Sequence, residues 1–175
     1  MSPPLIRRRH DADLDECVAV LAEVHRLDGY PMNWPVDPRR WLCEPRPTRA
    51  WVAVDAASAI VGHIAVHRVA APAQGRSARP TAEVARLFVS PAARGTGLGG
   101  ALLARARQWA TDSATDLVLE VAVGDTAAVA LYERTGWHHT GTRTASWTAP
   151  DGSSVSVRHF TVRPELSDAQ GRLAP

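Results

Sequence analysis

The stretch Arg94-Gly95-Thr96-Gly97-Leu98-Gly99-Gly100 joins an apolar segment that predicts a strand, residues 82–89, to a segment with helical periodicity, residues 98–111. Glycines at such a turn let the backbone approach a ligand closely, and the first N–H groups of a helix have no partner within it. The helix dipole and the Arg94 guanidinium add positive charge at the same place. The stretch therefore predicts an anion site that suits a diphosphate.

Two phosphate-binding motifs are excluded at this turn. No Gly-Lys-Ser/Thr follows the glycines, so the turn is not a Walker loop. The turn lies in mid-chain after Pro91, and no acidic residue lies on a second strand about twenty residues later, as a dinucleotide fingerprint requires. Asp116 falls near that spacing but precedes its strand. The glycines alone therefore leave the ligand open.

The rest of the chain predicts an α/β (α+β) fold, a mixed sheet with helices on its faces. Apolar periodicity and turn residues place the strands at 6–9, 51–55, 60–69, 82–89, 117–123, 137–148 and 154–162. The same signals place helices at 13–25, 98–111 and 126–134 and a helical turn at 38–42, with Asp13 and Glu16 as a capping box for the first helix. We expect one domain over residues 1–163 and a flexible tail over residues 164–175.

Composition and charge argue against several classes of partner and site. A formal net charge of +2 without a basic stripe argues against a nucleic-acid partner. The sequence has no apolar run of membrane-spanning length and no signal-peptide core at its start, so we expect no membrane partner and a cytoplasmic protein. Cys17 and Cys43 form no close-spaced motif, which argues against a disulfide framework or a zinc site.

Two blocks of the sequence resemble the GNAT acyltransferase superfamily. The motif Arg94-x-x-Gly97-x-Gly99 is similar to that family's Q/R-x-x-G-x-G/A signature, and Leu87–Pro91 is similar to the end of its fourth strand. The second block, Leu119-Glu120-Val121, Asp125 and Ala130–Trp137, resembles the family's L-E-V…N…A-x-x-L-Y-E-x-x-G-F. The resemblance implies a mostly antiparallel sheet of about seven strands, helices on both faces, and splayed fourth and fifth strands. It also implies an acetyl-CoA-dependent N-acetyltransferase.

The resemblance implies where acetyl-CoA binds. Its pyrophosphate is expected at the glycine turn, through Arg94, Gly95, Thr96, Gly97, Leu98, Gly99 and Gly100. Its pantetheine is expected along the fourth strand, at Leu87, Phe88 and Val89, like an added strand. Asp125 stands where the family usually has asparagine; it can cap the following helix but lacks the amide donor. No metal is expected.

Three residues are candidates for proton transfer. The resemblance gives Tyr132 the role of general acid near the thioester sulfur; alternatively its hydroxyl anchors the helix to the sheet. The resemblance also implies two candidates for the general base: Glu83 stands where some family members carry a glutamate that removes the ammonium proton, often through water, and Glu120 matches a glutamate implicated in catalysis in the family's ribosomal-protein acetyltransferases. The apolar residues that flank Glu120 predict a partly buried carboxylate with a raised pKa, and Glu83 is favoured as the base. The alternatives are a solvated strand end for Glu83 and a structural ion pair, for example to an arginine, for Glu120.

His63 and His67 lie four residues apart on one strand and therefore face the same side of the sheet. Such a pair suits a metal site or a proton relay. Because no third ligand lies nearby in the sequence, we favour a polar strand face instead.

The acceptor is expected to be a primary amine of a small molecule, peptide or protein. Tyr30 and Trp34 are candidates to line its pocket, although packing of a proline-rich loop explains them equally well. Asp28, Asp37 and Glu44 suit a cationic acceptor or a solvated surface. A catalytically silent acyl-CoA-binding regulatory module is the alternative function, and family members often form homodimers through their late strands.

Overall fold

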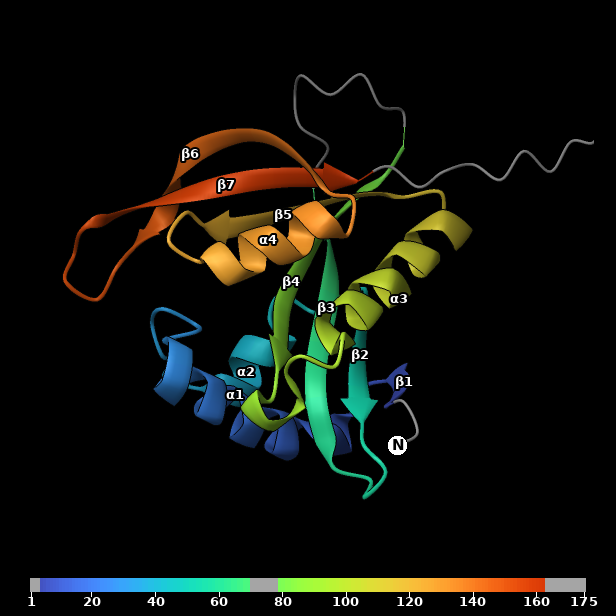
Figure 1. The fold of residues 1–175 in the computed structure, drawn as a ribbon. Coiled ribbons are helices and arrows are strands. Elements are labelled where there is room, and N and C mark those ends of the chain that lie inside the picture. Colours follow the sequence, from blue (N-terminus) through green and yellow to red (C-terminus); the bar gives the residue numbers. More distant parts are fainter. Residues whose placement is uncertain (1–3, 70–78, 163–175) are drawn as a thin grey trace, which may run out of the picture.

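A seven-stranded mixed sheet organises the described part of the protein, which in this computed structural model is residues 4–69 and 79–162. The strand order is β1-β2-β3-β4-β5-β7-β6 (Figure 1). The strands are β1 (Leu5–Arg8), β2 (Arg49–Val54), β3 (Ile60–Val69), β4 (Thr81–Val89), β5 (Asp116–Ala122), β6 (His138–Thr148) and β7 (Ser154–Val162). The predicted loop at 70–80 falls mainly, and the predicted tail at 164–175 entirely, outside the described residues.

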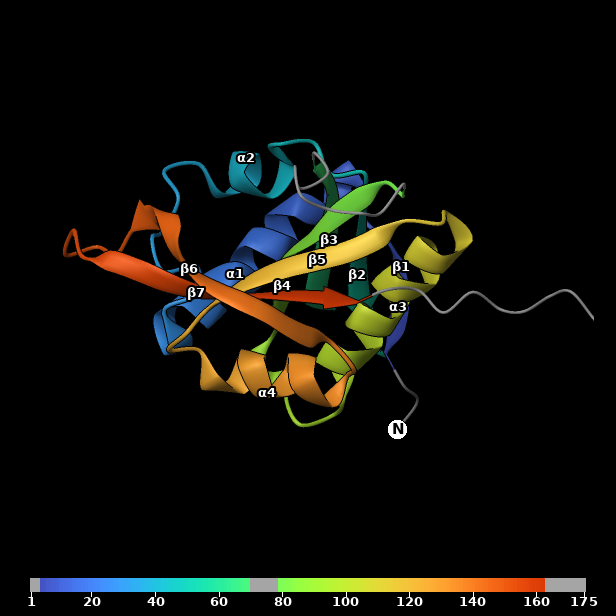
Figure 2. The same cartoon turned by 90° about the horizontal axis from the view of Figure 1, so that it is seen from above.

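Four α-helices cover the two faces of this sheet in the described residues. They are α1 (Leu14–Asp28), α2 (Pro38–Cys43), α3 (Leu98–Asp112) and α4 (Thr126–Arg134). The view from above shows α1 and α2 on one face and α3 and α4 on the other (Figure 2). The predicted fold class and element order are confirmed. No helix among the described residues is both long enough and apolar enough to cross a lipid bilayer.

Successive side chains of the central strands point to opposite faces of the sheet, and they form two separate hydrophobic cores. In β2, Trp51 and Ala53 belong to the cluster under α3, whereas Val52 and Val54 belong to the cluster under α1. Successive strand residues point to opposite faces, so a strand covered by helices on both sides is apolar at nearly every position. This explains why the middle of the sheet reads as a continuous apolar run.

β4 and β5 are paired at one end only. They run parallel and pair over Thr81–Glu83 and Asp116–Val118, and then separate (Figure 1). Residues 84–89 of β4 have no partner strand on that side within the described sheet. A bulge lies in this unpaired part of β4: the register between β3 and β4 shifts at Ile64, and Arg86 has a left-handed φ of 54°. The predicted splay of the fourth and fifth strands is confirmed.

The predicted capping box at Asp13 and Glu16 is wrong. A 3-10 turn over Asp11–Asp13 precedes α1, and the Asp13 carboxylate accepts from the His10 backbone N–H at 2.6 Å and from the Arg7 guanidinium at 2.7 Å. Glu16 accepts from the backbone N–H of Ile60 at 2.7 Å. Both carboxylates are therefore used by other parts of the fold rather than by the first turn of α1.

Candidate active site

The glycine turn leaves the N-terminus of α3 open. Gly95 and Gly97 have φ values of 74° and 82°, a region that favours glycine. Gly97 is the N-cap and offers no side chain to the helix, so the first N–H groups of α3 have no capping acceptor. Gly99 has a different role: a Cβ there would lie 3.1 Å from the Leu131 side chain, so it permits close packing of α3 on α4.

Arg94 beside this turn is held by an acid from α1. Its Nη1 donates to Asp28 Oδ1 at 3.0 Å, and its Nη2 donates to the other carboxylate oxygen. Asp37 caps α2 by accepting from Arg40 N at 2.9 Å, and Glu44 pairs with the Arg40 side chain at 2.7 Å. Each of the three acids of residues 28–48 therefore has a hydrogen-bond or ion-pair partner within the protein.

The free part of β4 presents different side chains to the two faces. Leu87 and Val89 pack against the core under α3, whereas Phe88 is buried on the α1 side. The Phe88 ring stacks on His63 with a centroid distance of 5.1 Å and an interplanar angle of 16°. We call the opening where β4 and β5 separate the split. Phe88 can therefore contact a ligand in the split only through its backbone.

Tyr132 lies on α4, deep in the core under α3 and α4. It is 8% exposed, and its ring lies 6.1 Å from the Trp137 ring and 5.8 Å from the Phe160 ring. No described residue hydrogen-bonds its hydroxyl, so the hydroxyl does not anchor the helix to the sheet; the ring does. Burial raises the pKa of Tyr132 above its usual value, with further contributions from nearby Tyr30 and Asp125. The phenol therefore stays protonated at neutral pH.

Glu83 and Glu120 lie near each other but differ in their partners. Arg143 Nε on β6 donates to Glu120 Oε1 at 2.8 Å, and the two side chains form an ion pair. Glu83 is half-buried and makes no hydrogen bond or ion pair within the described chain. Burial raises the pKa of Glu83, and the neighbouring Glu120 carboxylate raises it further, against smaller opposing effects of Arg86 and Arg143. Of the two carboxylates, Glu120 is therefore held in an ion pair and Glu83 is not.

The two aromatic candidates for the acceptor site have different surroundings. Tyr30 meets Trp41 of α2 edge to face at 6.3 Å, and burial raises the pKa of Tyr30 to about 12. Trp34 is 39% exposed and lies against His25 of α1 at 5.0 Å. Tyr30 is an electrostatic neighbour of both Arg86 and Tyr132, so it faces the split, whereas Trp34 belongs to the outer side of α1.

A hydrogen bond connects the loop before α2 to the far end of β6. Asn33 Nδ2 donates to the carbonyl of Thr148 at 2.8 Å. These residues lie 115 positions apart in the sequence. The loop that carries Tyr30 is thereby tied to the hairpin of β6 and β7 on the α1 side of the split.

The histidine pair is a buried, neutral part of the strand face. Arg9 Nη1 lies 2.9 Å from His63 Nε2, which must accept, so the ring proton sits on Nδ1 and is donated to the Arg86 carbonyl at 2.8 Å. Burial lowers the pKa of His63 to about 3 and that of His67 to about 4. His67 lies opposite Glu83 in the register of β3 and β4. In the described residues no three His, Cys, Asp or Glu side chains are placed to hold a metal.

These two histidines should make the protein sensitive to acid. The unfolded chain takes up protons below pH 6.5, whereas the folded chain does so only near pH 3 to 4, so the free energy of unfolding falls as pH falls. The expected slope is about 1.4 kcal/mol per pH unit for each histidine, offset in part by the raised pKa of Glu83. Urea titrations at pH 7, 6 and 5 measure it. His67→Gln should flatten the slope and exposed His138→Gln should not; equal stability at pH 7 and 5 would contradict the expectation.

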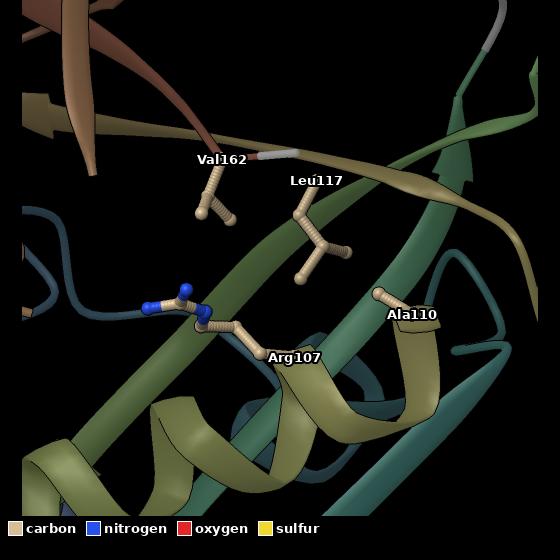
Figure 3. Close-up of a pocket in the computed structure, with 4 residues that line it drawn as sticks. All are labelled: Arg107, Ala110, Leu117 and Val162. Atoms are coloured by element: carbon tan, nitrogen blue, oxygen red, sulfur yellow. The ribbon is translucent and has the colours of Figure 1, made fainter. Parts of the chain in front are cut away.

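A small cavity lies away from these groups. It is lined by Arg107, Ala110, Leu117 and Val162, between the last turns of α3 and strands β5 and β7 (Figure 3). Arg107 Nη1 donates to the Thr135 carbonyl at the end of α4 at 2.6 Å. The cavity is a gap in helix-to-sheet packing, remote from the glycine turn at the other end of α3.

Sequence reasoning missed Arg86 and Arg143. Arg86 stands inside a predicted strand with apolar neighbours, and a charge at such a position is the signal that singles it out. Arg143 has no local signal, because its partner Glu120 lies 23 residues earlier in the chain.

Comparisons with known proteins agree with this geometry. A mixed sheet opened between β4 and β5, beside an open helix N-terminus, is what the sequence resemblance implies for an acyl-CoA-dependent transferase. The profile of the Acetyltransferase (GNAT) family matches residues 18–137, well over half of the chain. No curated protein sequence matches the chain significantly. The chain belongs to the GNAT acetyltransferase family, whose activity is acetyl transfer from acetyl-CoA to an amine.

Several solved structures share the fold over almost their whole length. Arabidopsis thaliana NAA60 in complex with a bisubstrate analogue is 17% identical, with 94% of this chain and 99% of that chain covered and a TM-score of 0.74. The ribosomal-protein-S18-alanine N-acetyltransferase of Escherichia coli is 17% identical, with 98% and 99% covered and a TM-score of 0.70. A spermidine N-acetyltransferase chimera from Vibrio cholerae and hSSAT is 20% identical, with 93% of this chain and 96% of that chain covered and a TM-score of 0.71.

Proposed function

We propose that this protein transfers the acetyl group of acetyl-CoA to a primary amine by direct attack, in a complex that holds both substrates. The observation that carries the proposal is the one-sided pairing of β4 and β5. It opens the sheet between the unpaired N-terminus of α3 on one face and Glu83 on the other. Donor and acceptor can thus approach the opening from opposite sides.

The donor is proposed to bind through backbone groups on the α3 side. The N–H groups of the glycine turn, residues 95–100, receive the pyrophosphate, and Arg94 adds a full charge. The open edge of β4 at Leu87–Val89 pairs with pantetheine as an added strand would. Asp125 accepts from Ala128 N at 3.0 Å as the N-cap of α4, so we assign it a capping role and no side-chain donation to the donor.

The protein's own groups move two protons. Glu83 removes the proton of the ammonium, directly or through water, which leaves a neutral amine to attack the thioester carbonyl. Bound acetyl-CoA supplies the activated acyl carbon. As the bond from that carbon to sulfur breaks, Tyr132 donates its hydroxyl proton to the departing thiolate, and the tyrosine regains a proton when the attacking nitrogen gives up its second one on forming the amide. Glu120 is assigned to its ion pair with Arg143 and stabilises the β5 side of the site rather than acting as base.

Three further proposals concern the setting of the reaction. We assign one domain to residues 1–163 and a cytoplasmic location, where acetyl-CoA is made and used. We also infer a homodimer through the edge strand β6, which lies at the end of the sheet and carries Trp147 at 41% exposure. The similar structures include a ribosomal-protein-S18-alanine acetyltransferase and a spermidine acetyltransferase, so both protein and small amines are open to this fold.

The test of the function is thiol release from acetyl-CoA. We expect release only when an amine is added, with one acetylated amine formed per thiol, measured by a thiol-reactive dye and mass spectrometry. Tight binding of CoA by calorimetry without thiol release across a broad amine panel would instead identify a catalytically silent acyl-CoA-binding module. Absence of CoA binding would contradict both functions.

Two variants test whether Arg94 contacts the phosphates of acetyl-CoA. Arg94→Gln should raise the KM for acetyl-CoA about 10-fold, since a charge-assisted bond to phosphate is lost. Asp28→Asn breaks the same ion pair from the other side but leaves Arg94 free for the donor, so its KM should not rise. An equal rise in both variants would show that the ion pair itself, rather than a contact to phosphate, is what matters.

A further inference from the structure

The α1 side of β4 carries a half-buried arginine that no acid neutralises. Arg86 lies at the β4 bulge with a φ of 54°, and its carbonyl is held by the His63 ring at 2.8 Å. Its guanidinium lies over the Trp41 ring, 4.5 Å from the centroid. Nε donates to the Trp41 carbonyl at 2.5 Å and Nη2 donates to the Glu44 carbonyl at 3.0 Å. These contacts fix the guanidinium in place.

The third guanidinium nitrogen of Arg86, Nη1, is available to a ligand. Nη1 has no hydrogen-bond partner in the described chain, and no carboxylate of these residues lies within ion-pair distance of the guanidinium. A charge that is partly removed from water without an opposite charge is unfavourable, and a planar guanidinium is suited to bind carboxylates. Such a group is expected to meet its anion in a bound ligand.

The neighbours of Arg86 place that anion beside the reacting amine. Glu83 and Tyr30 are electrostatic neighbours of the guanidinium. Ala82 and Val84 face the core under α3, so Glu83 between them faces α1 and α2. Arg86, which follows after the bulge, is on the same face because it contacts Trp41 of α2. An acceptor whose anionic group binds Arg86 therefore has its amine close to Glu83.

We propose that Arg86 binds a carboxylate of the acceptor, and that the acceptor is a free α-amino acid or a similarly short amine with an adjacent acidic group. The inference rests on the proposed function and names its substrate class. In an α-amino acid one carbon atom separates amine from carboxylate, so Glu83 and Arg86 can engage both groups at once. A peptide N-terminus has an amide at that position, and a polyamine would bring positive charge to an uncompensated guanidinium.

The charge balance of the surrounding residues supports this substrate class. Glu120 is neutralised by Arg143, Glu44 by Arg40 and Asp28 by Arg94. Glu83 has no ion pair in the described chain, and it is assigned to the amine. Arg86 is then matched by the acceptor's own anion.

The experiment compares acceptors that differ only in the carboxylate. Initial rates of thiol release are measured with free amino acids, the corresponding amino acid amides and the corresponding decarboxylated amines. For wild-type protein, kcat/KM for the best acid should exceed that of its amide by about 10- to 100-fold, mostly through KM. Arg86→Met should remove this preference by lowering the rate with the acid alone, and Arg86→Lys should retain part of it. Arg8→Met, an exposed arginine on β1, is the control and should keep the wild-type preference.

Distinct results would overturn the inference and the proposed function. Amides or peptide N-termini accepted as well as acids by wild-type protein would overturn the substrate class and leave the acetyltransferase function standing. An equal loss with acids and amides in Arg86→Met would assign Arg86 to structure alone. If Arg86→Met does not fold, the wild-type comparison and Arg86→Lys decide. No thiol release with any amine would overturn the proposed function, and this inference with it.

Discussion

Tyr132→Phe is expected to lower kcat by about 100-fold or more while leaving the fold intact. The tyrosine ring contacts Trp137 and Phe160, and phenylalanine preserves both contacts. The hydroxyl makes no hydrogen bond to the described residues, so its removal breaks none that the structure shows. The variant therefore isolates the proton that we assign to the leaving thiolate.

The physical reason is the match between donor and leaving group. The raised pKa of Tyr132 keeps the phenol protonated throughout the neutral range. A thiolate, whose conjugate acid has a pKa near 8.5, becomes a good leaving group when a proton reaches the sulfur as the bond to carbon breaks. Without that proton, the tetrahedral adduct returns to reactants more often than it expels the thiolate.

Steady-state kinetics together with thermal unfolding measure the effect. Tyr30→Phe is the comparison, because it removes the other tyrosine hydroxyl of the site; we expect it to change the KM of the acceptor more than kcat. A Tyr132→Phe variant with wild-type kcat, or one whose loss of activity follows a loss of stability, would remove Tyr132 from its assigned role.

Glu83→Gln is expected to lower kcat/KM for the amine by about 100- to 10,000-fold. The carboxylate must be ionised to accept the ammonium proton, so the wild-type rate should rise with pH through the pKa of Glu83. Burial and the neighbouring Glu120 raise that pKa, which moves the acidic limb of the profile above the usual range of a glutamate. The acidic limb should be absent in Glu83→Gln.

Glu120→Gln provides the matched control for this result. It breaks the ion pair with Arg143 and removes the negative charge nearest to Glu83. We therefore expect a loss of less than about 10-fold and an acidic limb shifted to lower pH, since a cause of the raised pKa of Glu83 is gone. A loss in Glu120→Gln as large as that in Glu83→Gln would reverse the assignment of the base.

Local signals made much of the fold predictable. Residues 126–134 were predicted as a helix and α4 has these bounds, because Asp125 at its start and Gly136 after its end act within a few residues. The glycine turn was predictable for the same reason. The capping box at Asp13 and Glu16 was wrong because Arg7 and Ile60 compete for the same carboxylates through the tertiary fold.

The sequence alone could not predict which side chains of the site form ion pairs with one another. The difference between Glu83 and Glu120 depends on Arg143, and the surroundings of Asp28 at the end of α1 depend on its ion pair with Arg94, 66 positions away. Neither pairing leaves a trace in local composition or periodicity. The resemblance to a family gave the candidate positions, whereas only the packed sheet distinguishes among them.

The short contact between β4 and β5 divides the sheet into two unequal halves. One half, β1 to β4, carries Glu83 at its border, and the other, β5 to β7, is covered by the helix that carries Tyr132. The proposed proton acceptor and proton donor thus lie on opposite sides of the β4–β5 pairing, which covers three residue pairs. The spacing between these two groups therefore depends on the backbone, through the way in which β4 and β5 diverge, as well as on the two side chains.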